Sequence, residues 1–153
     1  MSNKVIFLDY DGVVNTPMWD KEGKHCIYNH NGDNKVNNFQ AVQWVSHFCK
    51  NYNYDIVVTS TWRLWENYKE CLINGGLREG INIVGRTEVM HNKTRGEEIA
   101  DWLGHNEVED FLIFDDEDDV EPFMDKLVKC DTTKGFGMKE YYQAVDLITA
   151  NKK

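Results

Sequence analysis

Apolar residues occur along this chain in two patterns: short continuous runs, and longer stretches in which they return every three or four positions. Short runs that are bounded by polar or turn-forming residues and rich in β-branched or aromatic side chains are typical of buried strands. Spacing of three to four is typical of amphipathic helices packed on a sheet. The short runs predict strands at Lys4–Leu8, Asp55–Val58, Ile81–Val84, Phe111–Phe114 and Lys126–Cys130.

Helices are predicted between and after these strands. The longest apolar stripe is made by Val36, Phe39, Val42, Val45, Phe48, Cys49 and Tyr52. The second helix is expected to stop at Asn74–Gly76, and Gly104 is expected to close the third, because glycine is a common residue just after a helix. The predicted helices cover about residues 36–52, 66–73, 96–103 and 138–150.

This alternation of strands and helices indicates an α/β fold, in which a parallel sheet is covered by helices on both faces as a three-layer sandwich. A length of 153 residues fits one core, so residues 1–153 are expected to form a single domain. Within it, the polar and aromatic segment of about residues 12–35 predicts a loop or small hairpin over the strand ends.

Composition narrows the classes of partner. The net charge of -9 opposes broad binding to nucleic acid or to an anionic membrane, although a local basic pocket could still bind a nucleic acid end. No segment resembles a signal peptide or a membrane span, so we expect a cytoplasmic protein with no membrane partner. The four cysteines are widely spaced and fit reduced thiols, and no second cluster completes a zinc site with His25, Cys26 and His30.

Residues capable of chemistry follow three of the predicted strands. Asp9 and Asp11 follow the first strand, Thr59–Ser60 the second and Asp115–Asp116 the fourth. Ligands of parallel α/β sheets bind outside the carboxyl ends of the strands. The shared placement of these residues therefore predicts a functional site.

A divalent cation is the expected occupant of that site. The carboxylates of Asp9 and Asp11 repel each other unless a cation neutralises them, and the acidic run at 115–119 adds oxygen ligands from a second strand. Oxygen ligands suit Mg²⁺ better than zinc. An EF-hand calcium loop is excluded, because its fifth and sixth positions would be Val13 and Val14 instead of an acidic or amide residue and a glycine.

Several motifs carry a resemblance to a known family. DYDGVVN at 9–15, Thr59–Ser60, and FLIF before Asp115–Asp116 are similar to the first, second and fourth motifs of the haloacid dehalogenase (HAD) superfamily, which is dominated by phosphatases. TSTWR at 59–63, GRT at 85–87 and RGEEIADWL at 95–103 resemble the small capless HAD group named for Swiss Army Knife RNA repair proteins. The likeness covers nearly the whole chain. It implies a HAD-like Rossmannoid sheet with a small flap in place of a cap domain.

The resemblance also implies a mechanism. Asp9 would attack phosphorus to form an aspartyl phosphate, and Asp11 would act as acid and then as base. The implied cofactor is Mg²⁺, held by the Asp9 carboxylate, the Asp11 backbone carbonyl and the Asp116 carboxylate. Asp115 would reach the metal through water or orient other groups, and Asp119 is a candidate for a similar role.

Phosphate-binding residues are implied in the same way. Thr59 and Ser60 would donate hydrogen bonds to the phosphoryl oxygens. A cation is also expected: the residue type usual in the superfamily points to Lys93, whereas the RG pair of the narrower group points to Arg95, which we prefer. Arg63 lies just after the second motif and is a further candidate for binding phosphate.

The predicted function is that of a phosphomonoesterase on nucleotides or on terminal phosphates of nucleic acids. Capless members tend to accept large substrates, and Trp19, Trp62 and Trp65 could stack on a base, although tryptophans more often serve in packing. Small metabolites and phosphoproteins remain alternative substrates. A receiver domain fits less well, because the third predicted strand runs into Gly85 and Arg86 without an aspartate to be phosphorylated. The sequence leaves the oligomeric state open.

Overall fold

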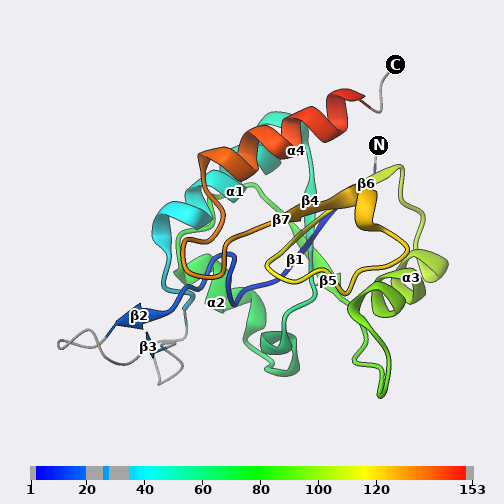
Figure 1. Cartoon of the computed structure of the whole chain (residues 1–153), viewed down its shortest axis with the longest axis horizontal. Coiled ribbons are helices and arrows are strands. Elements are labelled where there is room, and N and C mark those ends of the chain that lie inside the picture. Colours follow the sequence, from blue (N-terminus) through cyan, green and yellow to red (C-terminus); the bar gives the residue numbers. More distant parts are fainter. Residues whose placement is uncertain (1–2, 20–25, 28–34, 151–153) are drawn as a thin grey trace.

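The computed structural model describes residues 3–19, 26–27 and 35–150. Its centre is a five-stranded parallel sheet in the order β5-β4-β1-β6-β7. The strands are β1 (Lys4–Leu8), β4 (Asp55–Val58), β5 (Ile83–Arg86), β6 (Asp110–Asp115) and β7 (Leu127–Lys129). Because all five are parallel, their carboxyl ends share one edge of the sheet, with β1 in the middle (Figure 1).

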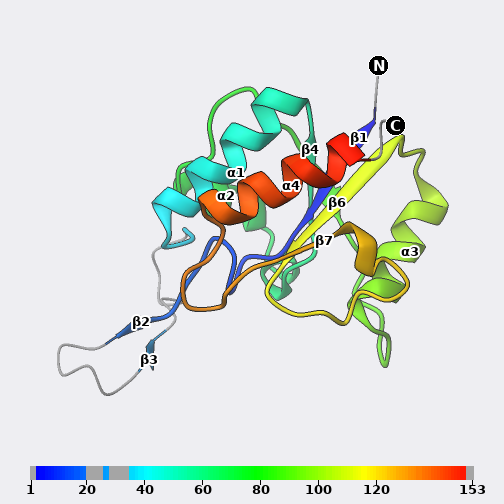
Figure 2. The ribbon, with the colours of Figure 1, turned by 45° about the horizontal axis from the view of Figure 1, so that its top comes forward.

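Helices cover both faces of this sheet, which gives three layers (Figure 2). One face is covered by α1 (Phe39–Tyr52), α2 (Tyr68–Asn74) and α4 (Met138–Ala150), and the other by α3 (Arg95–His105). Successive residues of β1 alternate between these layers, as the two-residue period of a strand requires. Ile6 and Leu8 join the cluster with α1, whereas Val5 and Phe7 join the cluster with Ile99 of α3.

The predicted α/β class and the parallel sheet with helices on both faces are confirmed. Four of the five strands lie within one residue of their predicted bounds, but β5 begins at Ile83 and not at Ile81. The carbonyl of Asn82 accepts from Ile56 N (2.9 Å), and the register against β4 then shifts between Ile56 and Val57. A strand at the edge of a sheet pairs with one neighbour. The bounds of β5 are therefore set by its pairing with β4 and not by the apolar run in its own sequence.

Two details of the helix predictions were wrong. The helix α1 begins at Phe39, because the Asn38 side chain caps it by accepting from Ala41 N (3.0 Å). Phe39 therefore lies on the first turn and is 61% exposed instead of part of the buried stripe. Gly104 does not close α3, which continues to His105. Asn106 Nδ2 then donates to the carbonyl of Trp102 in the last turn (2.9 Å). One glycine near a helix end costs only about 1 kcal/mol relative to alanine.

The segment predicted as a flap contains a hairpin. Strands β2 (Met18–Trp19) and β3 (Cys26–Ile27) pair antiparallel and project from the rest of the chain (Figure 1). The remainder of residues 20–34, including His25 and His30, lies outside the described residues. The extent of the domain over 1–153 stays a prediction. Over the described ranges, the chain has no helix of the length and apolarity that a membrane crossing needs.

Candidate active site

Hydrogen bonds that extend the sheet position the residues at its carboxyl edge. The backbone N–H of Asp9, just after β1, donates to Phe114 O of β6 (3.0 Å). The backbone N–H of Thr59, just after β4, donates to Leu8 O (2.9 Å). Each backbone is therefore fixed by its neighbouring strand, which brings the three predicted strand ends together.

Three carboxylates form a cluster there. Asp9, Asp115 and Asp116 each place an oxygen within 4.8 Å of the others, and Asp9 and Asp115 are buried. Burial raises the pKa of Asp9 well above its usual range; Asp115 raises it further, and Arg95 opposes both. Burial also raises the pKa of Asp115, again against the effect of Arg95. One arginine therefore does not compensate the negative charge of the cluster.

Arg95 is the cation that the structure brings to this cluster. Its Nη1 donates to Asp115 Oδ2 (2.7 Å) and lies 3.4 Å from Asp9 Oδ1. The Lys93 side chain is 49% exposed and pairs with Glu97 on the surface (3.4 Å). Thr94 explains the difference, because it forms a capping box with Glu97 and so makes Arg95 the first residue of α3.

Two glycines allow the acidic and basic parts of the site to approach each other. A Cβ at Gly96 would collide with the backbone carbonyl of Glu121, so glycine lets the first turn of α3 lie against this segment. Gly12 has a φ of +83°, and a Cβ there would collide with the Asp116 carboxylate. Gly12 therefore meets two demands, a left-handed backbone and space for Asp116.

Asp11 is oriented by two side chains. Asn15 Nδ2 donates to Asp11 Oδ1 (2.9 Å), and Trp62 Nε1 donates to the same oxygen (3.2 Å). Trp62 is buried, and its ring packs edge-on against Tyr10, with 5.4 Å between centroids. Trp62 thus combines packing with the positioning of Asp11, and its face is not open for a base.

The two residues of the second motif have different surroundings. The Thr59 hydroxyl is fully buried and has no hydrogen-bond partner in the described part of the chain. Leaving such a group unpaired costs about 1–3 kcal/mol, which indicates that a ligand completes its bonding. Ser60 Oγ accepts from Trp62 N (3.2 Å) and caps the short 3₁₀ helix η1 (Thr61–Leu64). Thr87, after β5, has a second buried and unpartnered hydroxyl.

Arg63 was expected to bind phosphate, but it lies buried beneath the strand ends. Its Nε donates to Thr87 O (2.9 Å), and its Nη1 donates to the carbonyls of Thr59 and Ser60. Its Nη2 forms a buried ion pair with Glu98 (3.0 Å). These contacts join the ends of β4 and β5 to α3, so the geometry favours a positioning role over direct contact with phosphate.

Replacing Glu98 with alanine is expected to destabilise the fold by about 3–5 kcal/mol, because it leaves the Arg63 charge buried and unpaired. It also removes the acceptor for Met90 N (2.9 Å). Urea unfolding measures the loss. Asp118→Ala is the matched control, since it removes an acid from an exposed pair with Lys129 (3.7 Å) and should cost less than about 1 kcal/mol. Equal losses in the two variants would contradict the positioning role.

The remaining acids of the DDEDD run are arranged in two groups. Asp116 lies in the cluster and accepts from Thr132 Oγ1 (2.9 Å). Glu117, Asp118 and Asp119 have exposed side chains, as expected of a solvated segment. The structure does not bring the Asp119 carboxylate into the cluster; its backbone carbonyl accepts from the N–H of the second residue of α3 (2.9 Å).

The donor set of the cluster fits a hard divalent cation. Three carboxylates from two strand ends converge, all of their ligand atoms are oxygens, and their charge exceeds that of Arg95. Mg²⁺ prefers such oxygen donors and is commonly held by one or two carboxylates together with water and phosphate oxygens. The residues present therefore fit the metal that the sequence predicts.

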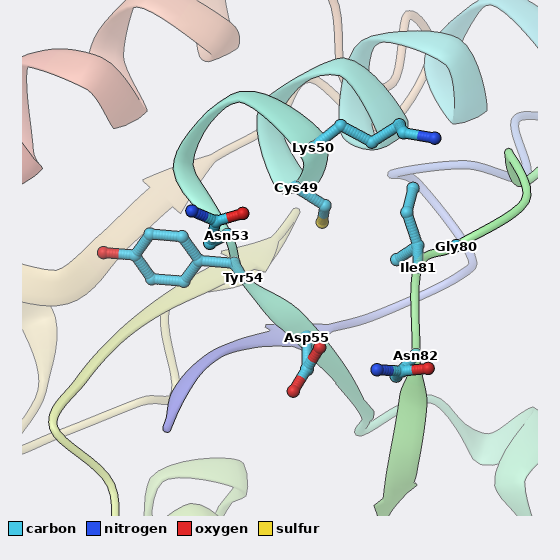
Figure 3. Close-up of a pocket in the computed structure, with 8 residues that line it drawn as sticks. All are labelled: Cys49, Lys50, Asn53, Tyr54, Asp55, Gly80, Ile81 and Asn82. Atoms are coloured by element: carbon cyan, nitrogen blue, oxygen red, sulfur yellow. The ribbon is translucent and has the colours of Figure 1, made fainter. Parts of the chain in front are cut away.

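A separate hollow lies at the other end of the sheet (Figure 3). It has a volume of about 510 Å³ and includes Asp55, the first residue of β4. The acidic cluster lies instead at the carboxyl ends of β1 and β6. Lys50 at its rim already donates to Glu79 O (2.7 Å). Its lining consists of Cys49, Lys50, Asn53, Tyr54, Asp55, Gly80, Ile81 and Asn82. None of these residues belongs to the predicted site, and we assign the hollow no function.

Sequence reasoning assigned no role to Asn15, Thr87, Glu98 or Thr132. Asn15 ends the DYDGVVN motif and Thr87 ends GRT, so both motifs offered a usable signal. Glu98 gave none, because an acid in the first turn of a helix is ordinarily a surface residue that suits the helix dipole. Its pairing with Arg63, 35 positions away, becomes visible only in the fold.

Comparison with known proteins gives one match. A family model described as the HAD domain in Swiss Army Knife RNA repair proteins matches residues 5–141. The match includes all five strands of the sheet except the first residue of β1, and it includes all the residues of the acidic cluster. No curated protein and no solved structure matches the chain.

Proposed function

The chain belongs to the family of HAD domains in Swiss Army Knife RNA repair proteins, and from this membership we propose that it is a Mg²⁺-dependent phosphomonoesterase. The family supports hydrolase activity of the phosphatase type. The proposed intermediate is an aspartyl phosphate on Asp9. The proposed substrates are nucleotides or terminal phosphates of nucleic acids. We further propose that the protein is cytoplasmic and that residues 1–153 form one domain.

One observation carries this proposal: a buried carboxylate and an unpaired hydroxyl follow adjacent strands, and a largely buried arginine from the start of α3 reaches the carboxylate. Asp9 lies 3.4 Å from Arg95, and Thr59 follows the strand beside it. A phosphoryl group needs a nucleophile on one side and hydrogen-bond donors around its oxygens. Asp9 is the nucleophile, and Arg95 and Thr59 are the donors.

The reaction has two steps. In the first, a carboxylate oxygen of Asp9 bonds to phosphorus, the bond from phosphorus to the leaving oxygen breaks, and Asp11 gives a proton to that oxygen. In the second, Asp11 takes a proton from water, whose oxygen attacks phosphorus and breaks its bond to Asp9. Asn15 and Trp62 both hold Asp11 Oδ1, so they orient the carboxyl group that moves the proton.

Mg²⁺ is held in this proposal by the Asp9 carboxylate, the Asp11 backbone carbonyl and the Asp116 carboxylate. Asp115 is already bonded to Arg95 (2.7 Å), so it orients that arginine or reaches the metal through water. When bound, the cation neutralises the charge that otherwise keeps an anionic phosphate away from Asp9. Lys93 has no part in the proposal, because its side chain points to the surface.

The substrate class rests on the family and on the size of the flap. The description of the family names RNA repair proteins, and the segment between β1 and α1 contains a hairpin of two-residue strands. A site without a large cap stays open to the end of a polymer. Small phosphorylated metabolites and phosphoproteins remain the alternative substrates.

Release of phosphate from a substrate panel tests the proposed function. The panel holds 3′- and 5′-phosphorylated oligonucleotides, mononucleotides, glycerol phosphate and phosphoserine peptides. We expect turnover with Mg²⁺, loss of turnover with a chelator and the highest kcat/KM on a nucleotide or an oligonucleotide. No turnover on any substrate would overturn the phosphatase proposal, and equal kcat/KM on all of them would overturn the substrate class.

A further inference from the structure

Trp65 is an exposed aromatic residue next to the proposed proton donor. Its side chain is 45% exposed, and its ring centroid lies 5.2 Å from that of Trp62. Trp62 in turn donates to Asp11 Oδ1 (3.2 Å). A continuous line of contacts therefore leads from the Asp11 carboxyl group through a buried indole to an exposed one.

Given the proposed function, on which this inference rests, the position of Asp11 fixes the side of the site on which the leaving group lies. Asp11 gives its proton to the leaving oxygen, so the leaving group must come within hydrogen-bond reach of Asp11. Trp62 touches Asp11 with its indole nitrogen and Trp65 with its ring. Trp65 is therefore linked through Trp62 to Asp11, the residue beside which the proposed reaction places the leaving group.

The local backbone holds Trp65 in place. Trp65 is the C-cap residue that follows the 3₁₀ helix η1, and its N–H donates to Trp62 O (3.0 Å). Leu64, beside it, is 65% exposed, so the two residues present apolar surface to the solvent. A leaving group such as glycerol or serine gains little from that surface. A leaving group with a flat ring gains stacking that is independent of base sequence.

We propose that Trp65 is a specificity-determining residue that stacks on the nucleobase of a nucleoside leaving group. The ring discriminates between classes of phosphomonoester, because a nucleoside presents a π face beside the scissile bond and an aliphatic alcohol does not. Trp62 is not exchangeable with Trp65 in this role, since it is buried and bonded to Asp11.

The test compares the kcat/KM for 3′- and 5′-adenosine monophosphate with that for glycerol phosphate. Removal of a stacking aromatic typically weakens base contacts by about tenfold or more. Trp65→Ala is expected to lower the ratio of the two kcat/KM values by about tenfold, whereas Trp65→Phe keeps most of it. Tyr142→Ala is the control, because Tyr142 is 58% exposed on α4 and should leave the ratio unchanged.

Each other outcome overturns either the inference or the proposed function beneath it. An unchanged ratio, or equal losses on both substrates, would mean that Trp65 acts only through packing on Trp62. A selective loss on a phosphotyrosine peptide would assign the ring to a tyrosine leaving group. A wild type that turns over no ester of the substrate panel refutes the proposed function instead. In that case, titration calorimetry measures the affinity of Asp9→Asn and of Asp9→Asn/Trp65→Ala for a 3′-phosphorylated adenine dinucleotide. Equal affinities of the two variants would overturn the stacking of Trp65 on the base.

Discussion

Replacement of Asp9 by asparagine is expected to lower the rate of phosphate release at least about 1,000-fold, because an amide cannot form the acyl phosphate. The amide keeps the size of the carboxyl group, so the fold should remain. Acid quenching after mixing with a ³²P-labelled ester measures the intermediate. Label should stay on the wild-type protein and be absent from Asp9→Asn. Normal turnover in this variant would exclude the covalent mechanism.

The same substitution should raise the stability of the metal-free protein at neutral pH. Burial and Asp115 raise the pKa of Asp9 in the folded state. The folded state therefore loses stability relative to the unfolded state as the pH rises above the pKa that Asp9 has in the unfolded chain. Asparagine removes this cost. The gain should appear at neutral pH in the presence of a chelator and vanish below about pH 4, where the carboxyl group is protonated in both states. Asp146→Asn, on the exposed face of α4, should show no such gain.

Replacement of Arg95 by methionine is expected to lower kcat by about 10²–10³-fold, in the range found when one donor to a transition-state oxyanion is removed. Arg95 contacts Asp9 and Asp115 and is the cation nearest the nucleophile among the described residues. Methionine keeps the length of the side chain without its charge. Steady-state kinetics on the best substrate of the panel measures the effect, and circular dichroism checks the fold.

Lys93→Met provides the matched control for Arg95. The Lys93 ammonium pairs with Glu97 on the surface of α3, so kcat should stay within about twofold and the stability should change by less than about 1 kcal/mol. A larger loss of kcat in Lys93→Met than in Arg95→Met would reverse the assignment of the two cations. Arg95→Lys should be more active than Arg95→Met and less active than the wild type. Lysine keeps the positive charge but lacks the two parallel N–H donors of the guanidinium group.

The sequence predicted the layout of the site because its main signals are local. Asp9, Thr59 and Asp115 each come directly after an apolar run, and parallel strands bring such positions to one edge. What the sequence left open depends on atoms far apart in the chain. Lys93 and Arg95 differ by two positions, and the capping geometry of Thr94 decides which of them turns inward.

The role expected for Arg63 changed for a related reason. Its place after the second motif suggested contact with phosphate, but it is the partner of Glu98, and the pair is buried. The sequence around Arg63 or Glu98 does not indicate that the two side chains will be buried as an ion pair. The requirement for Gly96 was also invisible, because it arises from the backbone of Glu121 on a different segment. Burial of charge and close backbone approach are properties of the assembled fold.

Segment 131–137 links parts of the site that the ribosome produces at very different times. Thr132 bonds Asp116, and Phe136 N donates to Val13 O (2.8 Å) in the loop after β1. A nascent chain therefore displays Asp9 long before the residues that enclose it have left the exit tunnel. Because a domain folds as a unit, we expect the site to be complete only after segment 131–137 has been made, late in the synthesis of the domain.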